Sequence, residues 1–475
     1  MVPAAGAHPL LQPAAARRAT TPGARGPRAA RAPEGPGLVS YQPVDVIEVF
    51  VWGRQLGAVA RNPATGMYAF EYAPEWIRGG VELAPLHMPL APTVYEFPGL
   101  AEATYHRLPP LLADALPDAF GNALVDRWMA DQGIDHAHIT PLDRLAYASD
   151  RGMGALEFRP PARTTDAAPP TAVQLADLVL AARQTVRGDL GDDALAHDAL
   201  EQLIQVGTSA GGARAKAVVA FNPQTAQVRS PYGPTPNGFE HWLIKLDGVG
   251  ARGLDGRTDR LGDGAPYCRV EYAYSRMAAA AGVEMAECRL LAEGPRRHFM
   301  TRRFDRGAGG AKHHVLTLCG MAHLDFNMVG AHSYDQYLQT VRALGLGGDA
   351  MQQAFRRMVF NVMAVNNDDH TKNVAFLRRE GGGWELAPAY DVTHAYRPGS
   401  VWTERHLMSV NGRYEGITLG DLYAVGERHD VPGYRRVVRE VRAAVDDWPA
   451  FAAEAAVPAA ATATIAADIT AVRPA

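Results

Sequence analysis

The stretch from Phe360 to Asp391 constrains the fold more than any other part of this chain. It begins in an apolar helical segment at 358–365, which ends at two consecutive asparagines. Two short apolar runs, 374–377 and 384–387, lie on either side of Gly381-Gly382-Gly383, and this pattern predicts two strands joined by a turn. The sequence therefore predicts a helix, a polar loop and a small hairpin, in that order.

The predicted loop is dense in groups that handle protons and cations. It contains Asp368, Asp369, His370, Lys372 and Asn373. Phosphoryl transfer needs a carboxylate to orient the attacking hydroxyl and oxygen ligands to hold Mg²⁺ against nucleotide phosphates. Protein kinases provide these groups as Asp-x-x-x-x-Asn, followed after a hairpin by a metal-binding Asp. Asp368 and Asn373 have this spacing, and Asp391 follows the hairpin. Because Asp369 is one residue too close, the pattern assigns the catalytic base to Asp368.

Two other interpretations of this loop remain open. Asn-Asn-Asp-Asp is also ordinary turn and helix-cap chemistry, so a solvated loop is one alternative. His370 and Lys372 suggest a metal-dependent hydrolase, although no second histidine stands at a ligand spacing such as His-x-x-x-His. The later aspartate and the flanking strands favour phosphoryl transfer.

Composition restricts the class of protein. A chain of 475 residues with 47% hydrophobic and 21% charged residues is typical of a soluble globular protein with two or three compact units. Its net charge of −4 excludes a positive electrostatic potential over the whole surface, which a general nucleic-acid-binding protein would need. The charge does not exclude a local basic patch. Cys268, Cys288 and Cys319 are far apart and odd in number, which favours a reducing compartment, the cytoplasm. No apolar run reaches the length of a membrane helix.

The chain divides into four regions by composition. Residues 1–43 are rich in Ala, Pro, Gly and Arg and have their first acidic residue at Glu34, so disorder is predicted there. A transit peptide would share this composition but would carry an amphipathic face, so a plain tail or a non-native start is favoured. A mixed α/β subdomain is expected over 44–160, a kinase N-lobe-like region over 161–330, and a mainly helical lobe with an Ala-rich tail over 331–475. In the first subdomain, strands are expected over 46–52, 57–61, 67–72 and 152–158, around a largely helical stretch at 108–132.

A glycine-rich segment at 207–216 precedes a predicted strand at 217–221. Small residues allow backbone N–H groups to approach phosphate oxygens closely, and Arg214 and Lys216 add positive charge. The segment is not a Walker A loop, because Ala213 stands where that motif has lysine. A structural turn is the alternative, but the position before a strand in a chain with a kinase-like loop favours phosphate binding.

Lys245 lies on a predicted strand at 241–246 and shares a face with apolar Leu243. Burial of a lysine on an apolar strand face is normally unfavourable. Contact between its ammonium group and nucleotide phosphates would compensate for this cost. An edge-strand lysine that reaches water is the alternative. Glu271, which opens an Ala-rich helix at 272–281, is a candidate partner for Lys245, or a glutamate favoured in a first helical turn.

Motifs along most of the ordered chain resemble the HipA family of bacterial toxin kinases, and they occur in the family's order. They are FEYAPEW at 70–76, APLHMPL at 84–90, LPDAFG at 116–121, DRGMGALEF at 150–158, TSAGGARAK at 208–216, WLIKL at 242–246, RRFDR at 302–306, NDDHTKN at 367–373 and LAPAYDV at 386–392. The resemblance implies an α+β fold of the two-lobed protein-kinase type, with an N-terminal mixed α/β subdomain and a mainly helical C-terminal lobe.

The resemblance also implies a function. Members of the family are toxins of type II toxin–antitoxin systems and act as serine/threonine protein kinases that use ATP and Mg²⁺. The implied substrate is a translation component such as an aminoacyl-tRNA synthetase. The implied partner is a small helix-turn-helix antitoxin, through which the chain would reach operator DNA, and no membrane is involved. A non-catalytic co-repressor subunit and a small-molecule kinase remain alternatives.

The resemblance also implies a functional role for individual residues, by their positions in the matching motifs. Asp368 is the implied base, Asn373 and Asp391 the Mg²⁺ ligands, and Lys245 the phosphate-binding lysine. The phosphate loop comprises Gly211, Gly212, Ala213, Arg214, Ala215 and Lys216, and the nucleotide site is lined by His370, Thr371, Lys372, Asn373, Tyr390, Asp391, Val392 and Thr393.

Ser209 stands where the family carries an autophosphorylated serine, with Thr208 as the neighbouring alternative. A phosphate there adds a charge of about −1.5 to −2 to a loop that binds ATP phosphates. Autophosphorylation is therefore expected to repel nucleotide and to inactivate the enzyme.

Overall fold

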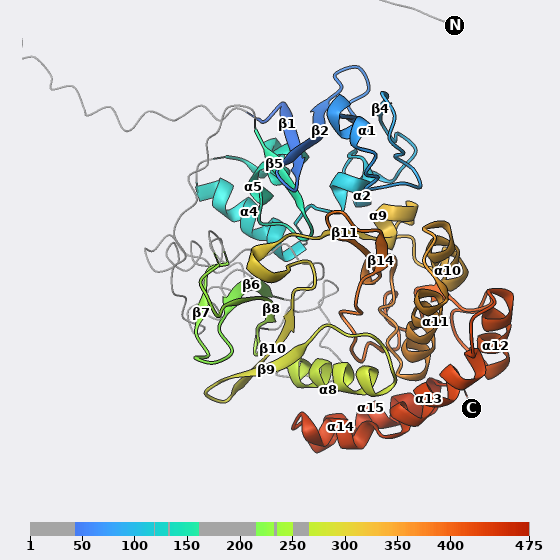
Figure 1. Ribbon diagram of the computed structural model, residues 1–475. Helices are drawn as coiled ribbons and strands as arrows, with labels where there is room; N and C mark the ends of the chain where they lie inside the picture. The colour runs from blue at the N-terminus through green and yellow to red at the C-terminus, as the bar shows by residue number, and fades with distance from the viewer. Residues whose placement is uncertain are drawn as a thin grey trace, which may run out of the picture. The chain divides into compact units, whose positions relative to one another are not determined.

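The computed structural model describes residues 43–117, 119–131, 134–160, 215–231, 235–249 and 266–474 (Figure 1). Pro43–Ala475 forms one compact unit. The tail at 1–42, the start of the predicted kinase N-lobe-like region at 161–214, which includes residues 207–214 of the glycine-rich segment, and residues 250–265 lie outside the described residues. None of the described helices is both long and apolar enough to cross a membrane.

The first subdomain is built on a five-stranded antiparallel sheet of order β4-β3-β2-β1-β5. Ile47, Val49 and Val51 are fully buried and alternate with more exposed residues, as expected for a strand that presents one face to a core. The strands are β1 (Val46–Val51), β2 (Arg54–Arg61), β3 (Tyr68–Tyr72), β4 (Val94–Tyr95) and β5 (Leu156–Arg159).

Five α-helices are described in this subdomain, and the stretch at 108–132, predicted to be largely helical, contains two of them. They are α1 (Pro74–Gly79), α2 (Glu102–Tyr105), α3 (Pro110–Ala113), α4 (Ala119–Asp131) and α5 (Pro141–Ala148). The start of α5 has a capping box, in which Thr140 and Asp143 each bond to the other's backbone N–H, and Pro141 is the first helical residue.

A second antiparallel sheet, of order β7-β6-β8-β10-β9, follows in the chain. Its strands are β6 (Lys216–Phe221), β7 (Val228–Arg229), β8 (Glu240–Lys245), β9 (Cys288–Glu293) and β10 (Arg296–Arg302). Helix α8 (Tyr267–Ala280) packs against β9 and β10. This helix begins one turn earlier than the sequence predicts, so Glu271 lies inside it and is buried rather than opening it.

The remainder is mainly helical, as predicted. The helices are α9 (Leu318–Ala322), α10 (Tyr334–Ala343), α11 (Gly348–Met363), α12 (Leu419–Arg428), α13 (Tyr434–Asp446), α14 (Trp448–Glu454) and α15 (Ala459–Val472). Helix α11 packs against α10 and α13, and its residues Phe355, Met358, Val359 and Val362 are buried at spacings of three and four.

Two small sheets accompany these helices. The hairpin predicted after the polar loop is present as β13 (Ala375–Arg378) and β14 (Trp384–Leu386), and β13 also pairs with β11 (His314–Thr317). A two-stranded parallel pair joins β12 (His332–Ser333) to β15 (Met408–Ser409).

Side-chain contacts fix the first subdomain to the rest of the unit. The carboxylate of Asp114 accepts hydrogen bonds from the backbone N–H and the hydroxyl of Thr317, both at 2.7 Å. His314 Nε2 lies 3.1 Å from the carbonyl oxygen of Leu83. These contacts hold β11, which supports the hairpin that follows the polar loop, against the N-terminal subdomain.

Candidate active site

Lys245, at the end of β8, is the centre of the candidate site. Its Nζ lies 2.5 Å from Oε1 of Glu271 on α8 and 2.5 Å from Oδ1 of Asp391. The side chain of Lys245 is 11% exposed and that of Asp391 is 23% exposed. Strand, helix and the segment after the hairpin therefore meet at one ammonium group, and the three residues that the sequence singled out lie together.

Electrostatics keeps Asp391 and Lys245 charged. Burial opposes ionisation of Asp391, but the charges of Lys245 and Lys216 hold the pKa of this carboxyl below its usual range. Burial likewise disfavours the ammonium, yet Asp391 and Glu271 raise the pKa of Lys245 above its usual value. The site therefore contains an ionised carboxylate and an ammonium group at neutral pH.

Lys216 adds a second cation beside Lys245. It begins β6, pairs directly with Lys245 across the sheet and is almost fully buried. Directly opposed residues of antiparallel strands project to the same face, and two like charges there are unfavourable without anionic partners. The backbone carbonyl of Ala215, just before this strand, accepts a hydrogen bond from the N–H of Leu246 at 3.2 Å. Gly211, Gly212, Ala213 and Arg214 of the predicted phosphate loop, and Ser209, lie outside the described residues.

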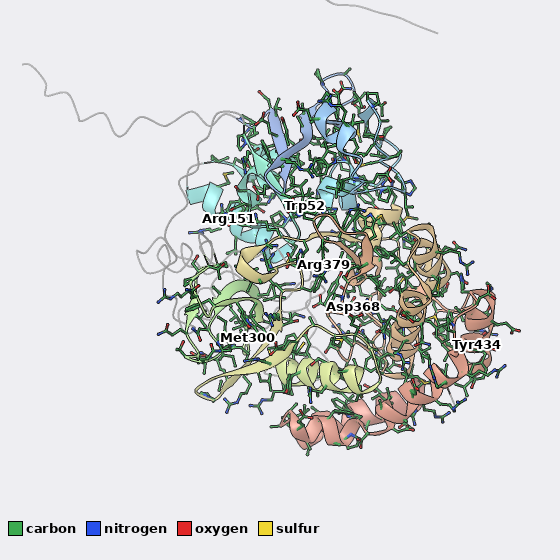
Figure 2. All side chains as sticks on the ribbon, viewed as in Figure 1. Trp52, Arg151, Met300, Asp368, Arg379 and Tyr434 are labelled. Atoms are coloured by element: carbon green, nitrogen blue, oxygen red, sulfur yellow. The ribbon has the colours of Figure 1, made fainter. Side chains whose placement is uncertain are left out.

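The polar loop begins where α11 ends. Val365 has a φ of 55°, an unusual conformation for a β-branched residue, and Asp391 has a φ of 52°. Asn373 donates from Nδ2 to the backbone carbonyl of Asp368 at 2.8 Å, which closes the loop on itself. The side chain of Asp368, which is labelled in Figure 2, is 45% exposed. Its Oδ1 lies 3.8 Å from Nε2 of His370. Asp368 is thus the accessible carboxylate of the loop.

Asp369, by contrast, is part of the protein interior. Its carboxylate accepts hydrogen bonds from the hydroxyl of Tyr334 at 2.7 Å and from the backbone N–H of Leu407 at 2.6 Å. His406 Nδ1 lies 2.8 Å from the same carboxylate. This buried network of hydrogen bonds fixes the loop to the protein interior. Sequence analysis missed it, because its members lie more than thirty residues from Asp369 and share no spacing with it.

The other predicted lining residues have varied roles. The hydroxyl of Thr371 donates to the carbonyl of Leu324 at 2.7 Å, and Val392 is buried in the core. Tyr390 donates from its hydroxyl to the carbonyl of Lys372 at 2.6 Å, and Lys372 Nζ lies 4.8 Å from the centre of the Phe326 ring. Asn373, Tyr390, Asp391 and Val392 share a hollow with His370, and Thr393 follows as a half-buried residue.

The donor set fits Mg²⁺ and a nucleotide triphosphate. Asn373 uses its Nδ2 for the loop, so its amide oxygen remains for a metal, and Asp391 engages Lys245 through one carboxylate oxygen. Oxygen ligands of this kind suit Mg²⁺. Oδ1 of Asn367 and Nδ1 of His370 are buried and have no hydrogen-bond partner within the described part of the chain. Two lysines beside two oxygen ligands match the requirements of a metal-bound triphosphate.

Comparisons with known proteins give consistent results. Among solved structures, HipA in the Shewanella oneidensis MR-1 toxin–antitoxin complex of HipA, HipB and operator DNA is similar, with a TM-score of 0.61 and 15% sequence identity over 89% of this chain and 94% of that chain. At this identity the likeness shows the fold, and it confirms the predicted α+β architecture. The Helicobacter pylori proinflammatory kinase CtkA has a TM-score of 0.29 and 10% identity, over 45% of this chain and 88% of that chain, which is too low to support an argument.

Among curated proteins, no significant match is found. Two family descriptions match the chain, namely the HipA N-terminal domain over residues 47–159 and the HipA-like C-terminal domain over residues 208–472. Because the second match alone spans more than half of the 475 residues, the chain belongs to the HipA family.

Proposed function

We propose that this chain is a Mg-ATP-dependent serine/threonine protein kinase and the toxin of a type II toxin–antitoxin pair. The observation that carries the proposal is the position of Lys245 Nζ, 2.5 Å from both Glu271 and Asp391. Protein kinases use a strand lysine, a helix glutamate and a metal-binding aspartate in this way. Family membership and the fold of a HipA protein support the same conclusion.

Each residue of the site has a role in this reaction. Bound Mg-ATP supplies the phosphoryl group that is transferred. Asn373 and Asp391 would hold the metal through their oxygen atoms, while Lys245 and Lys216 neutralise the phosphate charge. Asp368, half exposed at the loop surface, orients the hydroxyl of the protein substrate and accepts its proton. Glu271 keeps Lys245 in position when Asp391 engages the metal.

Replacement of Asp368 tests this function. The Asp368→Asn variant should lose phosphoryl transfer by about 10²–10⁴-fold, the range typical of a general base. Its stability should change little, because the side chain is half exposed. The purified protein and the variant are incubated with labelled ATP, Mg²⁺ and host lysate, and the labelled bands are identified. An unchanged signal in the variant would remove Asp368 from the mechanism.

A labelled aminoacyl-tRNA synthetase or another translation component among those bands would identify the substrate. Expression of the active protein should arrest growth, and expression of Asp368→Asn should not. Growth arrest by both proteins would favour a toxin that acts without catalysis.

The partner is proposed to be a small helix-turn-helix antitoxin, because the solved HipA structure is a complex with HipB and operator DNA. Co-purification of a helix-turn-helix protein with the tagged chain, together with operator binding only by the complex, tests this proposal. Operator binding by the chain alone would contradict it.

Ser209 is the proposed site of autophosphorylation and self-inactivation. Ser209→Ala should remain unphosphorylated and retain activity after prolonged incubation with ATP, whereas the parent protein loses activity. Mass spectrometry of the incubated proteins distinguishes Ser209 from Thr208. Equal loss of activity in both proteins would exclude this switch.

A further inference from the structure

A second polar cavity lies away from the candidate active site. Its volume is about 190 Å³, and it is lined by the loop after α5, by β8 and by the segment after β10. The lining side chains include Arg151 (Figure 2), Arg303, Arg306, Lys312, His241 and Thr235. His241 stands at the opposite end of β8 from Lys245, so this cavity and the nucleotide site are at different ends of the same strand.

Positive charge exceeds negative charge around this cavity. Asp305 is fully buried and is the carboxylate partner of both Arg303 and Arg306, at 2.6 Å and 2.8 Å. The two guanidinium groups are themselves almost fully buried. Lys312 pairs with Glu157 at 2.9 Å. Arg151 and the exposed carboxylate of Asp150 also line the cavity, so one positive charge remains in excess among the described groups.

The two buried arginines also have N–H donors that are not used in hydrogen bonds within the described part of the chain. Arg303 uses Nε and Nη2 to bind Asp305 and the carbonyl of Gly152, and Arg306 uses Nη1 and Nη2 for Asp305, Gly152 and Gly154. Within the described chain, Nη1 of Arg303 and Nε of Arg306 make no hydrogen bond. A guanidinium held rigidly by some of its donors can present the others to a planar or tetrahedral oxyanion.

The pair His241 and Thr235 leaves one more donor unused in either tautomer of the imidazole. Its Nε2 lies 2.8 Å from the hydroxyl oxygen of Thr235, and its Nδ1 is buried without a hydrogen-bond partner among the described residues. If Nδ1 carries the proton, that N–H is unused. If Nε2 carries it and donates to Thr235, the hydroxyl hydrogen of Thr235 is unused. Burial, together with Arg303 and Arg306, lowers the pKa of His241 to about 4, which is consistent with an excess of positive charge.

We propose that this cavity binds a tetrahedral dianion of the phosphate class. The cavity is large enough for such an ion, its walls carry the excess positive charge, and its free donors come from rigid, buried side chains. The anion has two possible sources, free inorganic phosphate or the phosphoryl group of a phosphorylated side chain, and both present the same three oxygen acceptors. The proposal is independent of kinase activity, because none of these residues belongs to the candidate active site.

Calorimetric titration of the full chain with inorganic phosphate tests the proposal. Arg306→Gln should weaken binding by at least about tenfold, as expected for the loss of a charge-assisted donor. Arg436→Gln, which removes an exposed arginine of α13, is the matched control and should bind as the parent does. Thr235→Val removes one hydroxyl with little change of shape, and it replaces Arg306→Gln as the test if that variant does not fold. It should weaken phosphate binding less, by a factor of about three or more.

The nucleotide site could also bind phosphate, so Lys245→Met is titrated in parallel. Binding that persists in Lys245→Met and weakens in Arg306→Gln or Thr235→Val supports the proposal. Binding lost only in Lys245→Met, or no binding at millimolar phosphate in the parent protein, overturns it. O-phosphoserine is the second probe: binding as tight as that of phosphate identifies a site open to a phosphorylated side chain, and binding of phosphate alone identifies a site for the free ion.

Discussion

At the scale of single residues, Lys245 is both a buried structural group and the centre of the proposed active site. A buried ammonium group needs paired charge, and here two carboxylates provide it at 2.5 Å each. Removing one member of a buried ion pair leaves the others uncompensated, which costs far more than the pair itself contributes. The ion pairs that carry the proposed function therefore also stabilise the folded protein.

Lys245→Met should destabilise the protein by about 3–5 kcal/mol at neutral pH, because Glu271 and Asp391 are left without their cation. In the parent, the depressed pKa of Asp391 means that its stabilising contribution is present above the ordinary carboxyl pKa and is lost as the pH falls through the folded value. In the variant, the buried carboxyl groups of Glu271 and Asp391 lose the charge of Lys245, so their pKa values should rise. Protonation should then stabilise the folded state as the pH falls from roughly 7 to 5.

Urea unfolding of both proteins across this range measures the two pH profiles. The double variant Lys245→Met/Glu271→Gln carries one carboxylate fewer and should recover part of the lost stability. Parallel profiles for parent and Lys245→Met would contradict the role given to this ion pair.

Asp369→Asn should also destabilise the fold, by about 2–4 kcal/mol, although Asp369 is the neighbour of the proposed base. The amide nitrogen cannot accept from Tyr334, His406 or the N–H of Leu407, so one of these donors is left unsatisfied. Urea unfolding measures the loss, and Glu415→Gln, at an exposed position, is the control. If Asp368→Asn proved the less stable of the two neighbours, the assignment of base and structural residue would be reversed.

Sequence spacing could separate these two aspartates but could not explain the difference. The five-residue step to Asn373 favours Asp368, whereas the burial of Asp369 depends on Tyr334 and His406, which only the fold brings near. Lys245 and Asp391 were predicted from local patterns, a charged residue on an apolar strand and an aspartate after a hairpin, whereas Glu271 was a candidate partner from its order along the chain alone. Their meeting at one point required the pairing of β8 with its neighbours and the packing of α8.

At the scale of elements, local sequence predicts most strands and helices but not all their ends. β1 and β3 show clear alternation of buried and exposed residues. The strand expected from Gly152 begins only at Leu156, because the carbonyls of Gly152 and Gly154 bind Arg303 and Arg306 and Gly154 adopts a φ of 81°. Such contacts come from residues some 150 positions away, beyond the range of any local pattern.

The start of α5 offers a test at this scale. Thr140→Ala removes the capping hydroxyl and should cost about 1 kcal/mol. Asp143→Ala should cost more, about 2 kcal/mol, because its carboxylate accepts from the backbone and hydroxyl of Thr140 and also from the N–H of Val44 at 3.0 Å. Thermal or urea unfolding ranks the two variants. An equal cost for both would mean that the contact to Val44 contributes nothing.

At the scale of the whole molecule, the order of motifs along the chain predicted the family and the fold, but not how its parts are joined. The N-terminal subdomain is fixed to the rest by polar contacts, and Asp305 lies at the centre of one buried group of them. It binds Arg303 and Arg306 and accepts a hydrogen bond from the N–H of Gly154 at 2.7 Å. RRFDR was recognisable as a motif, and its role in joining the two sheets could be seen only once residues 150–154 were placed beside it.

Asp305→Asn should therefore destabilise the whole unit by about 3–5 kcal/mol, because two buried guanidinium groups lose their common carboxylate. Burial opposes ionisation, but Arg303 and Arg306 lower the pKa of Asp305 well below its usual range, so in the parent this stabilisation persists above the ordinary carboxyl pKa and is lost only in strong acid. Urea unfolding followed by tryptophan fluorescence reports on both sheets, since Trp52 lies beside β1 and Trp242 is buried in β8. One transition shifted to lower urea is expected, with Asp446→Asn, at an exposed position, as the control. If the N-terminal sheet unfolded separately in the parent protein, the view of residues 43–475 as a single cooperative unit held together at Asp305 would be wrong.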